Sequence, residues 1–410
     1  MNFLKLFLGY RLWSFMAAFL CHSLVWQTNM QQALLIIVAL FFSLYAVLII
    51  YFRQAWIAVP NYKPQTINYK PQPRISVIIA ARNEEQNIIA CLNSLSAQYY
   101  PKDLFEVLVI DDFSTDKTAE LVSSYTAQNV KLIRLKDIIT DVDINSYKKK
   151  AIEIAIGRST GELIVTTDAD CTMPPTWLQT IATFYEENKP SFIVMPVSYD
   201  CNNSFFEKFQ ALDFMTLQGI TGAAVSKKML SMCNGANLAY TKKIFDEVGG
   251  FKGIDDIASG DDMLLMHKIY KKGPTGIKYL KSKESIVHTQ PMHTLKDFFN
   301  QRIRWASKAD QYEDKRIFAV LLLVYLFNLG IIILGIVALF NCAIAWWLLA
   351  VFAGKTIVEL FFLYPVAGFF NKRRMLWLFP LMQPFHIVYT IIAGWLGKFG
   401  SYKWKDRSVK

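Results

Sequence analysis

Hydrophobic and polar positions divide this chain into a mixed central part with apolar runs on both sides. Residues 34–52 carry no charge and can cross the ~30 Å hydrocarbon layer of a bilayer as one helix. Three more apolar runs follow near the C-terminus, at residues 317–340, 342–364 and 375–397. We therefore predict an N-terminal membrane region (1–60), a globular domain (61–315), C-terminal membrane helices (316–397) and a basic tail (398–410).

Two apolar segments do not fit a simple crossing. Residues 3–26 are apolar but contain Lys5, Arg11 and His22, which fits either a second transmembrane helix or an interfacial one. The last apolar run contains Pro380 and Pro384. It either crosses the bilayer, re-enters it or lies in the interface, and the side of the tail depends on which is true.

The central part alternates short apolar runs with segments of helical periodicity. Nearly continuous apolar runs, typical of buried parallel strands, lie at residues 75–80, 105–110, 130–135 and 163–167. Helical patterns lie between them, at residues 84–95, 118–125 and 149–156. This order predicts an α/β fold with a mostly parallel sheet, right-handed crossovers and helices on both faces. Ligands of such sheets bind beyond the carboxyl ends of the strands.

Acidic residues follow two of these strands. Asp168 and Asp170 come directly after the fourth strand, where carboxylate oxygens can bind Mg²⁺ or Mn²⁺ together with phosphate oxygens. Asp111 and Asp112 follow the second strand and can accept hydrogen bonds from a base or a ribose. The alternative for Asp168 and Asp170 is a solvated turn. For the other pair it is an Asx-turn and a helix cap, and there we expect both, with Asp112 binding ligand and Asp116 capping the next helix.

Further polar residues occur where a second ligand group could bind. Asp261 and Asp262 precede a helical pattern and predict a general base, or only a stabilised helix N-terminus. Gln301, Arg304 and Trp305 share a helical segment just before the membrane run. Guanidinium pairs with phosphate and indole stacks on sugars, so they predict a diphosphate and acceptor site; the alternative is an interfacial anchor.

Three lysines and one intramembrane pair complete the candidates. Lys148 and Lys149 lie in a run of three lysines, which is either a solvated charge run or a source of an ammonium group for phosphate. Lys355 and Glu359 are four residues apart within an apolar run. They can pair on one helix face, either as a structural ion pair or as the lining of an acceptor path.

Charge and cysteine content narrow the class of protein. The chain is 53% hydrophobic with a net charge of +11, and basic residues lie beside the apolar runs. This matches the positive-inside rule and predicts a cytosolic central domain. No basic stripe interleaved with aromatic residues is present, which argues against nucleic-acid binding. The six cysteines show no paired spacing, so we expect neither a metal cage nor a disulfide framework.

Taken in order, these motifs resemble those of the membrane-bound family 2 glycosyltransferases of the GT-A fold. That branch includes the cellulose, chitin, hyaluronan and poly-N-acetylglucosamine synthases and ceramide glucosyltransferase. The resemblance covers roughly residues 73–305 and the membrane runs after them. It is carried by the segments 75–84, 109–116, 167–170, 234–237, 249–251 and 260–262, and by the QxxRW set Gln301, Arg304 and Trp305.

The resemblance implies a role for each matching residue. Ala80, Glu84, Asp111 and Asp112 would line the nucleotide pocket, and Lys148 or Lys149 would approach the diphosphate. Asp168 and Asp170 would bind phosphate and Mg²⁺ or Mn²⁺. Asp262 would be the base, with Asp261 second. The synthases usually show Thr-Glu-Asp where this chain has Gly260-Asp261-Asp262, and this departure leaves the choice between the two aspartates open. Asn234, Gly235, Gln301, Arg304 and Trp305 would hold the diphosphate and the acceptor.

The implied reaction is an inverting transfer from a nucleotide sugar, usually a UDP-sugar, to a membrane-associated acceptor. We expect a bacterial inner-membrane protein that builds a cell-envelope polysaccharide. One alternative is the addition of a single sugar to a membrane lipid. Another is a non-catalytic membrane scaffold or sensor, which has no need for three acidic clusters. The chain is compact, so partner membrane subunits are also possible.

Overall fold

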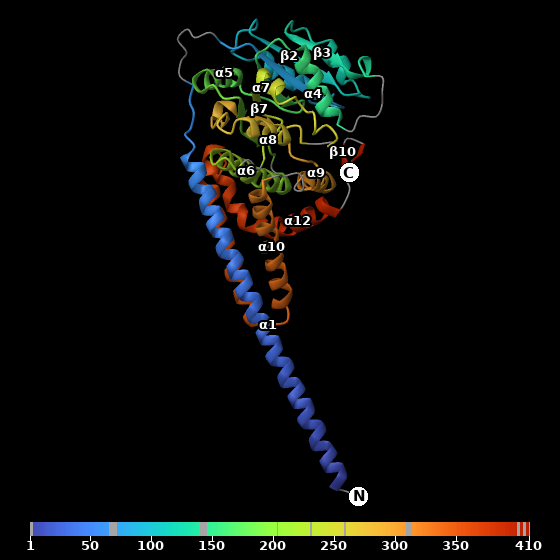
Figure 1. The fold of residues 1–410 in the computed structure, drawn as a ribbon, viewed down its shortest axis with the longest axis vertical. Coiled ribbons are helices and arrows are strands. Elements are labelled where there is room, and N and C mark those ends of the chain that lie inside the picture. Colours follow the sequence, from blue (N-terminus) through green and yellow to red (C-terminus); the bar gives the residue numbers. More distant parts are fainter. Residues whose placement is uncertain are drawn as a thin grey trace.

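The structure is a computed structural model with a globular domain at one end and long helices that run away from it (Figure 1). It describes residues 3–64, 72–139, 146–202, 204–229, 232–257, 260–308, 314–399, 402–404 and 407–409, with side chains from residue 29 to residue 399. The far end of the first helix carries the N-terminus, while the described end of the tail lies beside the domain (Figure 1).

A seven-stranded sheet forms the centre of the domain, in the order β3-β2-β1-β4-β7-β5-β8. The strands β3, β2, β1 and β4 are mutually parallel, and β7 runs antiparallel to both of its neighbours. The strands are β1 (Ile75–Ala81), β2 (Phe105–Asp111), β3 (Val130–Arg134), β4 (Leu163–Asp168), β5 (Phe192–Val194), β7 (Leu238–Thr241) and β8 (Ile277–Tyr279). The predicted mostly parallel sheet is therefore confirmed, with all four predicted strands in it.

Alternate residues of the central strands face opposite sides of the sheet, and helices cover both sides. Val77 and Ile79 pack under α2 and α5, whereas Ile78 and Ile164 pack under α4 and α8. The helices of the domain are α2 (Ile88–Ser96), α3 (Thr118–Ser123), α4 (Tyr147–Arg158), α5 (Trp177–Asn188), α7 (Lys242–Glu247) and α8 (Met263–Lys272). This burial on both faces explains why the strands are continuously apolar.

The first helix of the domain begins later than its periodicity predicts. We expected a helix from residue 84, but α2 begins at Ile88. The backbone N–H of Glu84 donates to Thr118 Oγ1 at 2.7 Å, and that of Glu85 donates to Asp116 Oδ2 at 3.0 Å. These bonds hold residues 84 and 85 against the loop after β2. Tertiary contacts therefore keep this turn out of the helix.

The base of the domain is made of two helices and a small sheet. The helices are α6 (Phe205–Ser226) and α9 (Leu295–Ala306), and β6 (Val197–Tyr199) pairs in parallel with β9 (Val287–Thr289). Short 3₁₀ turns lie at η1 (Leu135–Asp137), η2 (Lys283–Ser285) and η4 (Arg373–Leu378). In the tail, β10 (Tyr402–Trp404) pairs antiparallel with β11 (Arg407–Val409).

Four helices in the described part of the chain are long and apolar enough to cross a membrane. They belong to α1 (Phe3–Ala58), α10 (Lys315–Ala338), α11 (Cys342–Phe369) and α12 (Phe379–Phe399). The segment 3–26 is the start of α1, but its side chains lie outside the described part, and the candidate span begins at Asn29. From Gln31, which bonds Asn341, to Trp56, which packs on Phe369, α1 rises about 38 Å.

α12 differs from the other three because both of its ends stay with the domain. Just before it, Lys372 Nζ donates to Ser198 Oγ at 2.9 Å. Near its end, Gly397 lies so close to α9 that an added Cβ would be 2.6 Å from Ala306 Cβ. Figure 1 shows α12 running beneath α9, across the direction of α10. One face of α12 exposes Leu381, Phe385, Val388, Ile392, Trp395 and Phe399.

A buried lysine fastens α1 to the domain. Lys281 Nζ donates to the carbonyl oxygens of Trp56 at 2.8 Å and Val59 at 3.0 Å, at the C-terminus of α1. The same ammonium lies 4.2 Å from the centroid of the Trp56 ring. A cation at a helix C-terminus is stabilised by the unpaired carbonyls there. The domain is therefore held close to the end of the membrane helix.

Candidate active site

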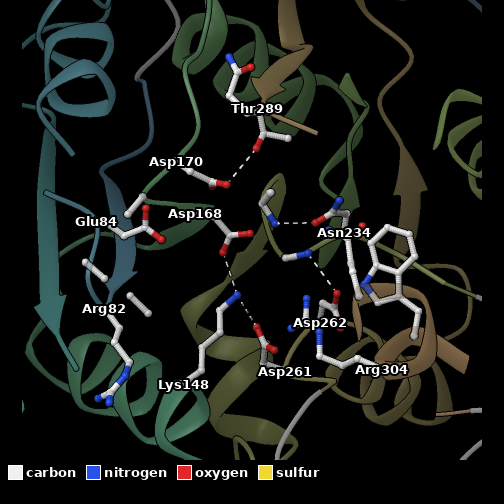
Figure 2. A pocket seen from close by; sticks show the side chains of 18 of the residues that line it. Arg82, Glu84, Lys148, Asp168, Asp170, Asn234, Asp261, Asp262, Thr289 and Arg304 are labelled. Carbon is white, nitrogen blue, oxygen red and sulfur yellow. Dashed lines mark hydrogen bonds and ion pairs between the residues drawn. The ribbon is translucent and has the colours of Figure 1, made fainter. Parts of the chain in front are cut away.

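One pocket lies beyond the carboxyl ends of β1, β2 and β4 and is closed from the other side by α9 (Figure 2). Most of the candidates from the sequence line it, although they come from distant parts of the chain. They are Ala80, Glu84, Asp112, Lys148, Asp168, Asp170, Asn234, Gly235, Asp261, Asp262, Gln301, Arg304 and Trp305. The parallel sheet explains the convergence, since strands of one direction end at the same edge.

Two candidates lie outside the pocket lining. Asp111 is buried at the end of β2, where its Oδ1 accepts a hydrogen bond from the Ser114 N–H at 3.2 Å. Lys149 points to the other side of α4, and its Nζ donates to the carbonyl of Ile254 at 2.6 Å. Burial lowers the pKa of Lys149 to about 8. Both residues therefore stabilise loops in this structure, and we withdraw them from the ligand site.

Lys148 is the cation at the centre of the pocket. Its Nζ lies 2.8 Å from Asp168 Oδ1 and 3.4 Å from Asp261 Oδ2 (Figure 2). Burial by itself would lower the pKa of this ammonium, but the two carboxylates outweigh burial and raise it. Lys148 therefore remains charged and links the end of β4 to the segment before α8.

The two aspartates before α8 have different environments. Asp262 is the N-cap of α8: Oδ1 accepts from the Met263 N–H at 2.7 Å, and Oδ2 accepts from the Gly235 N–H at 3.1 Å. Asp261 instead faces Lys148. Burial raises the pKa of Asp261, but the nearby lysines outweigh burial and lower it. The sequence offered a general base or a helix N-terminus as alternatives for Asp262. In the structure Asp262 caps α8 and also lines the pocket, so capping does not remove it from the site.

The residues after β4 offer only oxygen ligands. Asp168 and Asp170 both face the pocket, and Asp170 Oδ2 accepts a hydrogen bond from Thr289 Oγ1 at 3.0 Å (Figure 2). Among the described residues no three His, Cys, Asp or Glu side chains gather as a complete metal cage. Mg²⁺ is usually held by one or two carboxylates together with phosphate oxygens. The arrangement therefore fits a cation that arrives with a nucleotide diphosphate.

The pocket wall opposite the sheet comes from α9. Its N-cap is Thr294, whose hydroxyl accepts from the Asp297 N–H at 3.1 Å, so the predicted helix begins with a standard cap. Gln301 Oε1 lies 3.4 Å from the hydroxyl of Tyr199. The Trp305 ring lies 6.0 Å from that of Phe214. These contacts turn Gln301 and Trp305 toward the pocket.

The turn before β7 brings its backbone to the aspartates. Asn234 Oδ1 accepts from the Ala236 N–H at 3.0 Å, and Thr166 Oγ1 donates to the Gly235 carbonyl at 3.0 Å. A Cβ added at Gly235 would lie 3.2 Å from Asp261 Oδ2. A side chain here would crowd the acidic pair, which gives a packing reason for glycine.

Several lining residues were not among the candidates. They are Ala81, Arg82, Ala169, Tyr199, Phe214, Ala236, Thr289, Gln290, Met292 and Lys308. Lys308 Nζ lies 3.8 Å from Asp262 Oδ1, one turn beyond Trp305. Tyr199 and Thr289 end the short strands β6 and β9, which have no recognisable pattern in the sequence. Ala81, Arg82, Ala169 and Ala236 lie inside motifs that the sequence already showed, so these four could have been found.

Two family models match the chain. The model of glycosyl transferase family 2 matches residues 76–249, and that of glycosyl transferase family group 2 matches residues 163–395. The second match covers more than half of the chain. This chain belongs to glycosyl transferase family group 2. Both matches include the acidic residues after β4, and the second extends through α9 into the membrane helices.

Curated relatives agree with the family. The chain is 27% identical to the probable glycosyltransferase YdaM of Bacillus subtilis (strain 168) over 254 residues, 60% of this chain and 57% of the relative. It is 28% identical to the glycosyltransferase AglE of Haloferax volcanii over 194 residues, 47% of this chain and 59% of the relative. The matches thus span less than two-thirds of the length of these relatives.

A solved structure shares the fold. The mannosyltransferase PcManGT from Pyrobaculum calidifontis, in complex with GDP-Man and Mn²⁺, superposes with a TM-score of 0.56 at 19% identity. The match covers 89% of this chain and 98% of that one. At this identity the likeness concerns the fold alone. Together with the mostly parallel sheet, it confirms the predicted GT-A fold class.

Proposed function

We propose that this glycosyltransferase moves a sugar from a nucleotide-sugar donor to an acceptor at the membrane surface. The donor we expect is a UDP-sugar, which is the usual donor of the family. The observation that carries this proposal is the meeting of three groups in one pocket. They are the carboxylates after β4, the acidic pair before α8 and the QxxRW residues of α9. A scaffold or sensor has no use for all three, so we set that alternative aside.

The donor would lie along the edge of the sheet. Ala80, Glu84 and Asp112 are available to a nucleoside, and Lys148 and Arg304 offer positive charge to its diphosphate. Asp168 and Asp170 would hold Mg²⁺ or Mn²⁺. Such a cation stabilises the negative charge of the departing diphosphate. The charges around the pocket thus favour the release of a nucleoside diphosphate.

The acceptor would lie between α9 and α8. In the reaction, an acceptor hydroxyl oxygen attacks the anomeric carbon, the bond from that carbon to the diphosphate oxygen breaks, and Asp262 takes the hydroxyl proton. A single displacement of this kind inverts an α-linked donor to a β-glycoside. We favour Asp262 over Asp261 as the base, because Lys148 lies closer to Asp261, at 3.4 Å, than Lys308 lies to Asp262, at 3.8 Å. Gln301 and Trp305 would hold the acceptor sugar.

We also propose that the catalytic domain lies in the cytosol of a bacterial cell, against the inner membrane. Only α1, α10 and α11 would cross the bilayer, while α12 would lie in the interface with its exposed apolar face toward lipid. Of these three crossings only α10 and α11 lie between the domain and the basic tail, and two crossings put both on the same side. This arrangement satisfies the positive-inside rule for both, including Lys372, Arg373 and Arg374.

The product would be a cell-envelope polysaccharide or a glycolipid that carries one added sugar. The packing of the membrane helices favours the glycolipid. A Cβ added at Gly354 of α11 would lie 2.8 Å from the Phe42 ring of α1, and one at Gly330 of α10 would lie 3.1 Å from Val38. Helices in such close contact leave no room between them for a polymer. Export of a polymer would therefore require partner membrane subunits.

The test uses the purified full-length protein in nanodiscs of bacterial lipid. UDP- and GDP-sugars are supplied with Mg²⁺ or Mn²⁺, and release of nucleoside diphosphate is measured. We expect release from one donor, lost by about 100-fold or more in Asp262→Asn. Asn still caps a helix, so the variant should fold. Mass analysis of the product then separates a polymer from a glycolipid, and no release from any donor with lipid present would contradict the proposal.

A further inference from the structure

Arg302 lies inside the QxxRW segment, but it is not part of the pocket lining. Its side chain is 4% exposed and lies between α9, α6 and α12. We propose that Arg302, held by Asp213 and Tyr389, is a positioning residue that fixes Gln301 and Trp305 in the orientation the acceptor needs. This inference rests on the proposed function, because it concerns how the acceptor-binding residues of the same site are held in place.

The guanidinium of Arg302 contacts Gln301 and Trp305, two of the pocket residues of α9. Its Nη1 donates to Gln301 Oε1 at 2.8 Å. Its central carbon lies 4.4 Å from the centroid of the Trp305 ring and 4.7 Å from that of Phe298. A planar cation can stack on an indole and donate in its own plane at the same time. One side chain therefore sets the orientation of two others.

Arg302 is in turn held from two other helices. Its Nη2 lies 2.6 Å from Asp213 Oδ2 of α6, and the Asp213 side chain is only 3% exposed. The hydroxyl of Tyr389, from α12, donates to Asp213 Oδ1, and His386 Nε2 lies 3.8 Å from the same oxygen. The Tyr389 ring also packs edge-on against Phe298. The interfacial helix α12 thus reaches the pocket through Asp213 and Arg302.

Helix packing alone does not explain a buried ion pair here. Removing two charges from water costs several kcal/mol, and well-packed apolar side chains often hold helices together equally well. An apolar side chain could not donate to Gln301 or offer a cation to Trp305. These two contacts are the features of Arg302 that only an arginine supplies, and both end on residues of the pocket.

The first variant keeps the positive charge at position 302 but removes the planar guanidinium. In Arg302→Lys an ammonium can still pair with Asp213, but it cannot stack on Trp305 while donating to Gln301. We expect turnover to fall roughly 10- to 100-fold, as displaced positioning groups cause. Binding of UDP or GDP, measured by thermal shift, should change by less than about twofold, because Gln301 and Trp305 are at the acceptor end.

A charge swap separates positioning from stability. Asp213→Arg with Arg302→Asp preserves an ion pair between α6 and α9 but removes the guanidinium from Trp305. We expect the melting temperature to recover relative to Arg302→Asp alone, while turnover stays low. Recovery of both would overturn the proposal and leave Arg302 with a purely structural role.

The domain supplies a control at the edge of the sheet opposite the pocket. Glu106, whose side chain is 9% exposed, pairs there with Lys131 Nζ at 2.9 Å. Glu106→Gln should lower stability without lowering turnover of the folded fraction.

A spectroscopic readout covers the case in which no donor is turned over. With 5-fluorotryptophan incorporated, the ¹⁹F signal assigned by Trp305→Phe should shift or broaden in Arg302→Lys but not in the control. An unchanged signal would refute the positioning role whatever the activity, whereas a shifted signal without any turnover would contradict only the proposed function.

Discussion

Replacing Glu106 by Gln should destabilise the domain in a pH-dependent way without affecting the pocket. Glu106 is the second residue of β2, at the edge of the sheet opposite the pocket. Its Oε1 accepts from Ser76 Oγ at 2.8 Å and from the Thr160 N–H at 2.7 Å, and its Oε2 pairs with Lys131 Nζ at 2.9 Å. The carboxylate therefore connects three strands and the turn before β4.

The size of the effect follows from the pKa of Glu106. Burial raises this pKa, but the bonds from Thr160, Lys131 and Ser76 outweigh burial and lower it from 4.5 to about 2. At about 1.4 kcal/mol per pH unit, the ionised form stabilises the fold by about 3 kcal/mol. Lys131 is 57% exposed, so solvent screens part of this, and we expect about 2 to 3 kcal/mol.

The sign of the pH dependence is fixed because the folded-state pKa is depressed. The stabilisation is present in full above about pH 4.5, where the unfolded chain is also ionised, and it is lost as the pH falls toward 2. The gap in unfolding free energy between wild type and Glu106→Gln should therefore narrow by about half from about pH 7 to about pH 3.

The assay is denaturant unfolding of the full-length protein in nanodiscs at several pH values, with nucleotide release measured in parallel. Glu153→Gln is the control, because that carboxylate is 42% exposed and pairs with Lys150, which is exposed as well. It should change stability by less than about 0.5 kcal/mol. A gap for Glu106→Gln that is the same at every pH, or a large loss of activity at pH 7, would refute the reasoning.

Three further predictions concern the site and the membrane. Chelation of divalent cations should abolish turnover. Asp170→Asn should raise the Mn²⁺ concentration for half-maximal rate by about tenfold or more. If that concentration does not change, Asp170 is not a metal ligand. In a cysteine-free background, a cysteine at Ser408 should react with an impermeant maleimide only from the cytosolic side, and labelling from the other side would mean that α12 crosses. Gly397→Leu should displace α12 from α9, lower stability by about 1 to 3 kcal/mol and reduce turnover, whereas Gly273→Ala, which has open space around it, should do neither.

The sequence by itself determined the sheet and most of the site. Strands that are buried on both faces need continuous apolar runs, so β1 to β4 could be located from the positions of such runs in the sequence. The acidic residues that follow β2 and β4 could then be assigned to one edge, because parallel strands share their carboxyl ends. The helical pattern around Gln301, Arg304 and Trp305 likewise located α9, since its polar residues recur at helical spacing.

The sequence pattern could not show which of two neighbouring residues with the same side chain faces the pocket. Lys148 and Lys149 are equivalent in the sequence, yet the rotation of α4 turns only Lys148 to the pocket. Asp111 and Asp112 differ for a similar reason, because successive residues at a strand end face opposite sides. Tyr199 and Thr289 were missed, since strands of three residues show no periodicity.

Only the tertiary structure shows what α12 and Arg302 contact. The apolar content of residues 375–397 fits a transmembrane helix as well as an interfacial helix. Composition alone does not show which side chains pack against the rest of the protein. Contacts of Lys372 and Gly397 with the domain hold both ends of α12 on one side of the bundle. Arg302 pairs with Asp213, which Tyr389 also contacts, and contacts between residues so far apart in the chain exist only after folding.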